Sequence, residues 1–214
     1  MNTDELEDQV VGLSEWQNRH YFGKYRGIVN AVLEGDDLGV ISAKVPDVFG
    51  ADFVVERVRP CSPFAGSKHG FVAIPEVDDG VWVEFEAGNP SLPIWTGFWW
   101  ASGEMPEPKG KLVRSFITTK GHQLLLDDDA NEVTLLHAGG AEMTMKDGDI
   151  TIKIENTSIK LTKSDITLQV GASPMSPSIK ITSSDITVQS STIGSVKLTS
   201  AGVDIGNGAM KIGG

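Results

Sequence analysis

The C-terminal part of the chain alternates apolar and polar residues with a period of two, which is typical of β-strands. Residues 149–154 read Asp-Ile-Thr-Ile-Lys-Ile, so three isoleucines share one face of the predicted strand and the polar residues share the other. Two phrases then alternate along residues 148–214: Ser-Ile-Lys-Leu-Thr, as in 158–162, and Asp-Ile-Thr-Leu-Gln, as in 165–169. Such internal repetition predicts an elongated stack of short strands.

Each repeated strand has one narrow apolar stripe, and the repeat contains no aromatic residue to cover it. A unit this short cannot enclose a core, so its apolar face must be shared. We expect three chains to form an intertwined trimeric β-helix around one interior, with a single-chain meander or solenoid as the alternative. The residues expected in the trimer core are Ile150, Ile152, Ile154, Ile159, Leu161, Ile166, Leu168, Ile179, Ile181, Ile186, Val188, Val196, Leu198, Val203 and Ile205.

The N-terminal segment predicts one amphipathic helix from Thr3 to about His20. Leu6, Val10 and Leu13 follow the spacing i, i+4, i+7, which places them on one side of a helix. This side either packs on the chain's own next domain or docks on a partner, and the sequence leaves both open.

Residues 25–100 show strand patterns separated by turns rich in Gly, Pro and Asp. Five or so strands within roughly 80 residues are typical of a small closed barrel of the OB type. The fold class is therefore all-β: an N-terminal helix, an OB-fold barrel and a C-terminal β-helix. The segments expected to form barrel strands are 25–33, 38–46, 53–60, 70–75, 80–86 and 92–99.

Aromatic residues gather near the end of the barrel, at Trp95, Phe98, Trp99 and Trp100. Such a group could stack single-stranded nucleic acid, but the segment is acidic and has few Lys or Arg to hold phosphates. The formal net charge of −11 also argues against nucleic acid or an anionic membrane as the partner. We therefore interpret these aromatics as core and subunit-interface residues.

The single cysteine, Cys61, excludes an intrachain disulfide, and we expect it to be a small buried residue beside Pro60. No apolar run approaches the length of a membrane span, and the acidic first residues are unlike a signal peptide. These features predict synthesis in the cytoplasm without a signal peptide.

The sequence offers little catalytic or metal chemistry. Residues 127–129 are three aspartates followed by Asn131, which could bind calcium, but they lie between two strand patterns where such residues form an ordinary hairpin turn. His122 has no Ser, Cys or carboxylate partner at a motif spacing. We therefore expect no catalytic residue, no cofactor and no metal.

Three segments of the barrel carry a family resemblance. They are Leu38-Gly-Val-Ile-Ser-Ala-Lys-Val-Pro-Asp-Val-Phe-Gly, Val58-Arg-Pro-Cys-Ser-Pro-Phe-Ala-Gly, and residues 70–97 with their Pro, Gly and Asp turns. They resemble the OB domain of central spike proteins of contractile injection systems: T-even-type tail spikes, phage baseplate assembly protein V and VgrG proteins. Residues 118–128 resemble the family's junction between barrel and β-helix.

The resemblance implies a short spike without the hub domain of full VgrG proteins and without the lysozyme domain of the T-even spike. The implied organisation is an N-terminal docking segment at 1–22, an OB barrel at 23–103, an extended linker at 104–120 and a trimeric β-helix at 121–214. It implies a non-enzymatic needle, linking hub to tip at the centre of a baseplate in a virion or injection particle, which pierces the target envelope when the sheath contracts. The alternative is an adhesin-like OB binding module on a trimeric stalk.

The last strand pattern leaves Met210 and Ile212 as apolar residues with nothing evident to cap them. A terminal rung of stacked strands needs a cap. We expect a separate tip protein, of the PAAR type that the resemblance suggests, to bind Met210 and Ile212. A hub protein is expected at the N-terminal end.

Overall fold

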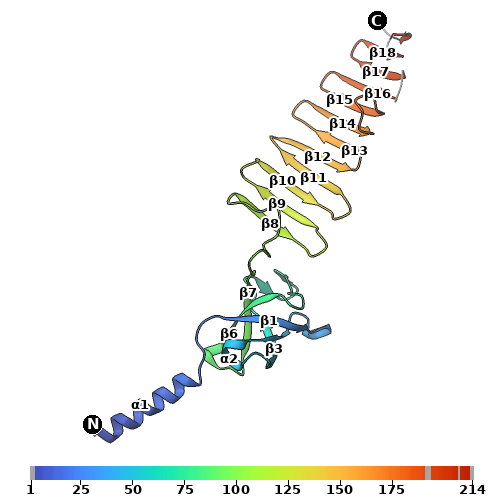
Figure 1. Ribbon diagram of the computed structural model, residues 1–214. Helices are drawn as coiled ribbons and strands as arrows, with labels where there is room; N and C mark the ends of the chain where they lie inside the picture. Colours follow the sequence, from blue (N-terminus) through green and yellow to red (C-terminus); the bar gives the residue numbers. More distant parts are fainter. Residues whose placement is uncertain (1–2, 191–193, 207, 213–214) are drawn as a thin grey trace. The chain divides into compact units, whose positions relative to one another are not determined.

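The computed structural model describes residues 3–190, 194–206 and 208–212. The chain divides into two compact units, Met1–Met105 and Pro106–Gly214, and each is described by itself (Figure 1). The first unit holds the helix and the barrel, and the second is a single sheet. This all-β organisation confirms the predicted fold class.

The first unit begins with helix α1 (Thr3–Asn18), as the spacing of its apolar residues predicted. No helix among the described residues is long and apolar enough to cross a membrane. The remaining elements of this unit are β1 (Tyr25–Val32), η1 (Gly35–Asp37), β2 (Ile41–Lys44), α2 (Pro46–Phe49), β3 (Val54–Pro60), β4 (Ala65–Gly66), β5 (His69–Gly70), β6 (Gly80–Phe85), η2 (Glu86–Gly88) and β7 (Pro93–Phe98).

Five strands close into a barrel in the order β1-β2-β3-β7-β6, with β6 returning to β1. All pairs are antiparallel except β3 and β7, which run parallel. The alternation that predicted these strands points every second residue of β6 inward, which buries Val81, Val83 and Phe85. The buried apolar core consists of Val29, Ile41, Ala43, Val45, Val55, Val58, Val81, Val83, Phe85 and Trp95.

Two tryptophans near the end of the barrel pack against it and donate indole hydrogen bonds to its backbone. Trp95 is buried, and its Nε1 donates a hydrogen bond to the backbone oxygen of Gly39 at 2.9 Å. Trp99 packs so closely on Gly80 that a Cβ there would lie 2.6 Å from its ring, and its Nε1 donates to Val81 O. Trp95 therefore has the core role that we preferred for these aromatics.

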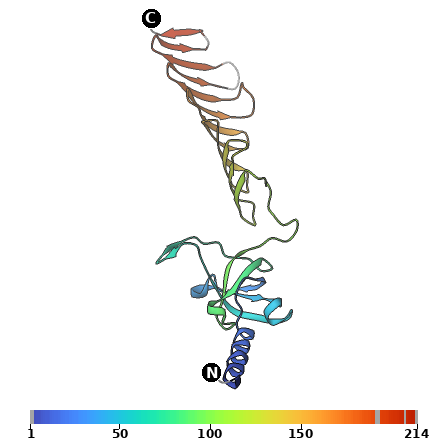
Figure 2. The ribbon, with the colours of Figure 1, turned by 90° about the vertical axis from the view of Figure 1, so that its left-hand side faces the viewer.

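Two expectations for this unit are wrong. The apolar run 70–75 forms no barrel strand, because it lacks alternation and ends in Pro75, which has no N–H to donate; only its first residue pairs, in the hairpin β4–β5 (Figure 2). Cys61 is exposed rather than buried, since it follows the last residue of β3, where the chain leaves the barrel.

The second unit is a sheet of twelve strands in which every strand pairs antiparallel with its neighbours in sequence (Figures 1 and 2). The strands are β8 (Val113–Ile117), β9 (Gln123–Asp127), β10 (Glu132–Leu136), β11 (Ala141–Lys146), β12 (Asp149–Ile154), β13 (Thr157–Leu161), β14 (Asp165–Val170), β15 (Ser178–Thr182), β16 (Asp185–Gln189), β17 (Ser195–Thr199), β18 (Gly202–Ile205) and β19 (Met210–Ile212).

This sheet differs from the expectation in two ways. An intertwined β-helix would pair strands from different chains, whereas here each chain builds its own meander, because tight turns such as Asp147-Gly148, both with positive φ, return the chain beside the strand it has just left. The sheet also begins before residue 121: β8 lies inside the segment 104–120 that we interpreted as a linker, and it pairs with β9.

The barrel makes a specific stability prediction. Replacing Trp95 by Phe removes the indole donor and leaves the Gly39 carbonyl without its partner, which should cost about 2 kcal/mol of unfolding free energy. Trp100→Phe, at a side chain that is 59% exposed, should change it by less than about 0.5 kcal/mol. Urea unfolding followed by the remaining tryptophan fluorescence measures both. Equal effects of the two substitutions would contradict this account of the core.

Candidate assembly interface

One face of the C-terminal sheet is made of two columns of apolar side chains. In β12, Ile150 lies opposite Met145 and Leu161, while Ile152 lies opposite Met143 and Ile159. Directly opposed residues share a face of the sheet, so each column continues from strand to strand. Within β11–β19 none of the described residues on this face is charged.

The structure brings together all residues that we predicted for the trimer core. Their columns run without a register shift from β12 to β18. One column holds Ile150, Leu161, Ile166, Ile181, Ile186, Leu198 and Val203, and the other holds Ile152, Ile159, Leu168, Ile179, Val188, Val196 and Ile205, with Ile154 beside it at the end of β12.

This face is not buried within the chain. Ile159, Leu168, Ile179 and Val188, on four successive strands, are all between 37% and 42% exposed. Such uniform exposure means that no described element covers the columns. The described sheet is one layer thick, and a one-layer sheet with an apolar face is unstable in water unless another surface covers it.

The apolar face is longer than the repeat that predicted it. The added residues show the same period of two, but they lie outside the repeated phrases, so a search for repeats misses them. In the register of β8–β11 they are Phe116, Leu124, Leu126, Val133, Leu135, Met143 and Met145.

The opposite face of the sheet is polar and equally regular. Its central row alternates Thr and Lys from β12 to β15: Thr151, Lys160, Thr167 and Lys180 are successive cross-strand partners. This alternation places a threonine-bearing strand between successive lysines, which lowers their mutual repulsion. The row continues with Thr187 and Lys197.

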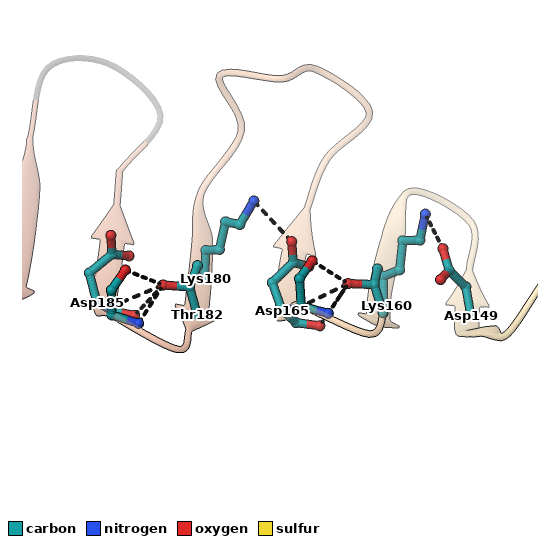
Figure 3. A network of polar contacts seen from close by, with 9 residues as sticks. Asp149, Lys160, Asp165, Lys180, Thr182 and Asp185 are labelled. Atoms are coloured by element: carbon teal, nitrogen blue, oxygen red, sulfur yellow. Dashed lines mark hydrogen bonds and ion pairs between the residues drawn. The ribbon is translucent and has the colours of Figure 1, made fainter.

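Each of these lysines makes a diagonal ion pair with an aspartate on the preceding strand, as Figure 3 shows for the first two. The Nζ–Oδ2 distances are 3.0 Å for Lys160–Asp149, 3.2 Å for Lys180–Asp165 and 3.1 Å for Lys197–Asp185. Exposed pairs of this kind contribute only about 0.2–1 kcal/mol each. Their main effect is to make this face nearly neutral and strongly hydrated.

The turns at one edge of the sheet are held by threonine hydroxyls. Thr182 Oγ1 accepts hydrogen bonds from the backbone N–H groups of Ser184 and Asp185 at 3.2 and 3.0 Å and donates to the Asp185 oxygen (Figure 3). Thr162 makes the same set of bonds with Ser164 and Asp165. The Thr-x-Ser-Asp phrase therefore specifies a tight turn that keeps successive strands in one chain.

A further ion pair joins β10 to β11. Lys146 Nζ donates to Glu132 Oε2 at 2.9 Å, and this hydrogen bond lowers the pKa of Glu132 below its ordinary value and raises the pKa of Lys146. Thr134 also donates to Glu132, which lowers the pKa of the carboxyl further.

The two residues predicted to bind a tip protein lie in the last strand. Met210 and Ile212 of β19 pair with Ile205 and Val203 and extend both apolar columns by one residue. They are 54% and 53% exposed, more than the residues inside the columns. Among the described residues, no strand pairs with the other edge of β19.

The residues considered for chemistry have structural partners. Asp127 Oδ1 accepts the N–H groups of Asp129 and Ala130, which confirms the hairpin turn. His122 lies beside His137, with ring centroids 4.6 Å apart. In the described part of the chain, no three His, Cys, Asp or Glu side chains are grouped so that they could hold a metal ion.

A second apolar surface lies beside the barrel. A cleft of about 460 Å³ separates strand β7 from the extended segment 71–74, and exposed Cys61 lies at it. Its walls are mostly apolar, with Leu38, Phe71 and Phe98 all more than 40% exposed.

Known proteins match the barrel. The model of the Type VI secretion system/phage-baseplate injector OB domain matches residues 25–100. The Type VI secretion system spike protein VgrG3 of Vibrio cholerae is 35% identical over 111 residues, which are 48% of this chain and 10% of that protein. Actin cross-linking toxin VgrG1 of Vibrio cholerae is 38% identical over 90 residues, 38% of this chain and 8% of the toxin.

The chain thus spans a tenth or less of the length of these relatives. Its resemblance to the VgrG-like baseplate spike proteins, first drawn from the barrel motifs, is confirmed by the matched domain and by both relatives. The activities that the relatives' names mention belong to those proteins.

The ion pair between β10 and β11 predicts a pH response. Because the pKa of Glu132 is lowered in the fold, its contribution to stability is present above the ordinary glutamate pKa and is lost as the pH falls through the lower folded value. The unfolding midpoint of the wild-type protein should therefore fall more between pH 6 and pH 3.5 than that of Glu132→Gln. Lys146→Gln should flatten the response equally, and parallel losses in all three proteins would contradict the assignment.

Proposed function

We propose that this protein, whose residues 25–100 match the injector OB domain, is the non-enzymatic central spike of a contractile injection machine. The observation that carries the proposal is the continuous, half-exposed apolar face of β8–β19, in a chain that also carries a barrel of the spike-protein type. In this role the sheet belongs to a rod that pierces the target envelope when the sheath contracts, as part of a virion or injection-system particle.

Three copies of the chain, related by a threefold axis, cover one another's apolar faces. Each sheet forms one side of a three-sided prism, with the two apolar columns inside and the rows of Thr and Lys outside. Each of about twenty side chains that becomes fully buried adds on the order of 1 kcal/mol. Threefold closure rests on the resemblance to central spikes, and a twofold sandwich of sheets is the competing arrangement.

The ladder of the sheet suits a mechanical role. The strands are stacked in sequence order, so their backbone hydrogen bonds run along the stack and carry a load applied along it. Each strand from β9 to β18 pairs on both edges, so within the described sheet only β8 and β19 have a free edge. A rod built in this way resists buckling and has no unpaired strand edge along its sides.

The two ends of the chain have separate partners in this proposal. The barrel and helix join the spike to a hub protein of the baseplate. A tip protein of the PAAR type covers Met210 and Ile212, whose exposure and unpaired strand edge supply the binding surface. Neither partner is a nucleic acid, and no cofactor takes part.

An OB binding module on a trimeric stalk is the second candidate. The cleft beside β7 favours it, because an apolar hollow with a few polar groups is a common ligand site. Gene neighbourhood separates the two: adjacent genes for sheath, tube and baseplate proteins support the spike.

The trimer predicts a face-specific response to charge. Ile166→Asp places three carboxylates in the shared interior without water, so the protein should lose its assembly. Multi-angle light scattering should give three times the 22.9 kDa chain mass for the wild type and one chain mass for the variant.

The neighbouring residue supplies the matched control. Thr167→Asp adds the same carboxylate on the polar face, between Lys160 and Lys180, and should leave the trimer intact. A wild-type mass of two chains would favour the sandwich, and a monomeric wild type would refute shared burial altogether.

The proposed tip surface predicts a variant that loses the tip protein and keeps the trimer. Ile212→Asp should abolish binding of the tip protein while the trimer mass stays unchanged, because the charge lies in the last strand of the apolar columns and leaves the columns of the other strands intact. Ile212→Leu keeps the apolar surface and should keep the tip. Copurification of the tip protein with each variant from assembled particles measures this, and retention of the tip by the charged variant would contradict the site.

A further inference from the structure

Helix α1 has an apolar side that no described residue covers. Val10 and Leu13 are 63% and 61% exposed, and Leu6 is 43% exposed. Among the described residues, the ring contacts of the helix lie at its C-terminal end, where Trp16 stacks on His20 with ring centroids 4.3 Å apart and lies 5.7 Å from the ring of Phe22. The rest of α1 therefore has no partner among the described residues.

The end of the helix is nevertheless fixed. Tyr21 N donates to Gly88 O at 2.8 Å, and the ring of Phe22 packs so closely on Gly88 that a Cβ there would lie 2.8 Å away. His20 Nδ1 lies 2.7 Å from Trp16 O, at the last turn of the helix. The barrel thus holds the base of α1, while its apolar side stays open.

The sequence of α1 gives an isolated helix little stability. Isolated helices shorter than about 12–15 residues are marginal in water even when they are rich in alanine, and α1 has only 16 residues. This one has Val10, Val11 and Gly12 in its middle, three residues of low helix propensity. The helix therefore depends on packing of its apolar side.

The exposed side has the spacing of a coiled coil. Leu6, Val10, Leu13 and Gln17 are separated by four, three and four residues, which are the d and a positions of two heptads. At about 100° per residue they lie within roughly 60° of one another on the helix.

The acidic residues are placed away from this stripe. Asp8 and Glu15 lie on the opposite side in the helical register, and Glu7 lies at its flank. The positions flanking the stripe on one side, Gln9 and Trp16, are uncharged. Parallel copies of so acidic a helix repel one another unless their charges point outward, and this register points them outward.

A short stripe also limits the choice of partner. Two heptads, roughly 21 Å of helix, bury too little surface to bind a free protein tightly. They suffice when the partners are already held together, because the effective concentration inside one assembly is then high. Copies of α1 in one trimer meet this condition, since the threefold axis that relates the sheets also relates the helices.

We propose that the three α1 helices of the spike form a parallel three-helix coiled coil through Leu6, Val10 and Leu13. This inference rests on the trimer of the proposed function, and it adds a second, independent contact between the same subunits. The bundle would present a ring of acidic residues outward, so the surface that it offers to any hub protein is acidic.

Cysteine cross-linking in the full-length protein tests the bundle. Exposed Cys61 is first replaced by Ser, so that each chain carries a single introduced thiol. Leu13→Cys places three thiols around the bundle axis, within the Cα separations that a disulfide allows. Glu15→Cys, two residues away, places them on the outer side and is the matched control.

Under mild oxidation, Leu13→Cys should give at least about tenfold more covalent dimer than Glu15→Cys, because only two of three thiols can pair and only the inner ones meet. Light scattering under the same conditions gives the number of chains. In addition, Val10→Asp should lower the helical circular dichroism signal without changing the trimer mass.

The outcomes separate the two proposals. A trimer in which both cysteines cross-link equally, or in which Cys at position 13 stays free, overturns the coiled coil alone and indicates that another protein covers this side. A monomeric wild type overturns the trimer and the coiled coil with it. A trimer with selective cross-linking at position 13 supports both.

Discussion

The constraint on which the structure depends is that a sheet one layer thick cannot bury its own apolar face. The barrel solves the same problem within one chain, because β6 returns to β1 and encloses Val29, Ile41, Val81 and the rest of the core. The C-terminal strands never close, so their apolar columns remain half exposed. One chain therefore contains a unit whose core is complete alone and a unit whose apolar face needs a covering surface.

The period of two predicted most of the strands and the apolar face of the sheet, because it fixes which side chains share a face whatever the partner strand is. It could not decide whether neighbouring strands come from one chain or from three. That choice lies in the turns: Asp147-Gly148 and the Thr-x-Ser-Asp phrases reverse the chain within two or three residues, so hairpins within one chain form. Turn length therefore decides the pairing, and the repeat alone does not.

Elements without repetition were harder to predict. Strand β8 has only one short stretch of alternating residues, and Arg114 interrupts its apolar face. Arg114 forms an ion pair with Asp128 in place of an apolar contact. The sequence of β8 therefore resembles a linker. The run 70–75 is apolar without alternation and resembles a strand, yet it lies along a cleft. In both cases the tertiary partner, which the local sequence does not reveal, decides the conformation.

The polar face of the sheet limits which side of the sheet an assembly can bury. Its Lys–Asp pairs are exposed and contribute little to stability, yet they recur on β13, β15 and β17 at the same register. A charged, hydrated face cannot be buried against another sheet without losing that hydration. The pairs therefore favour the apolar side of the sheet as the side that another surface covers.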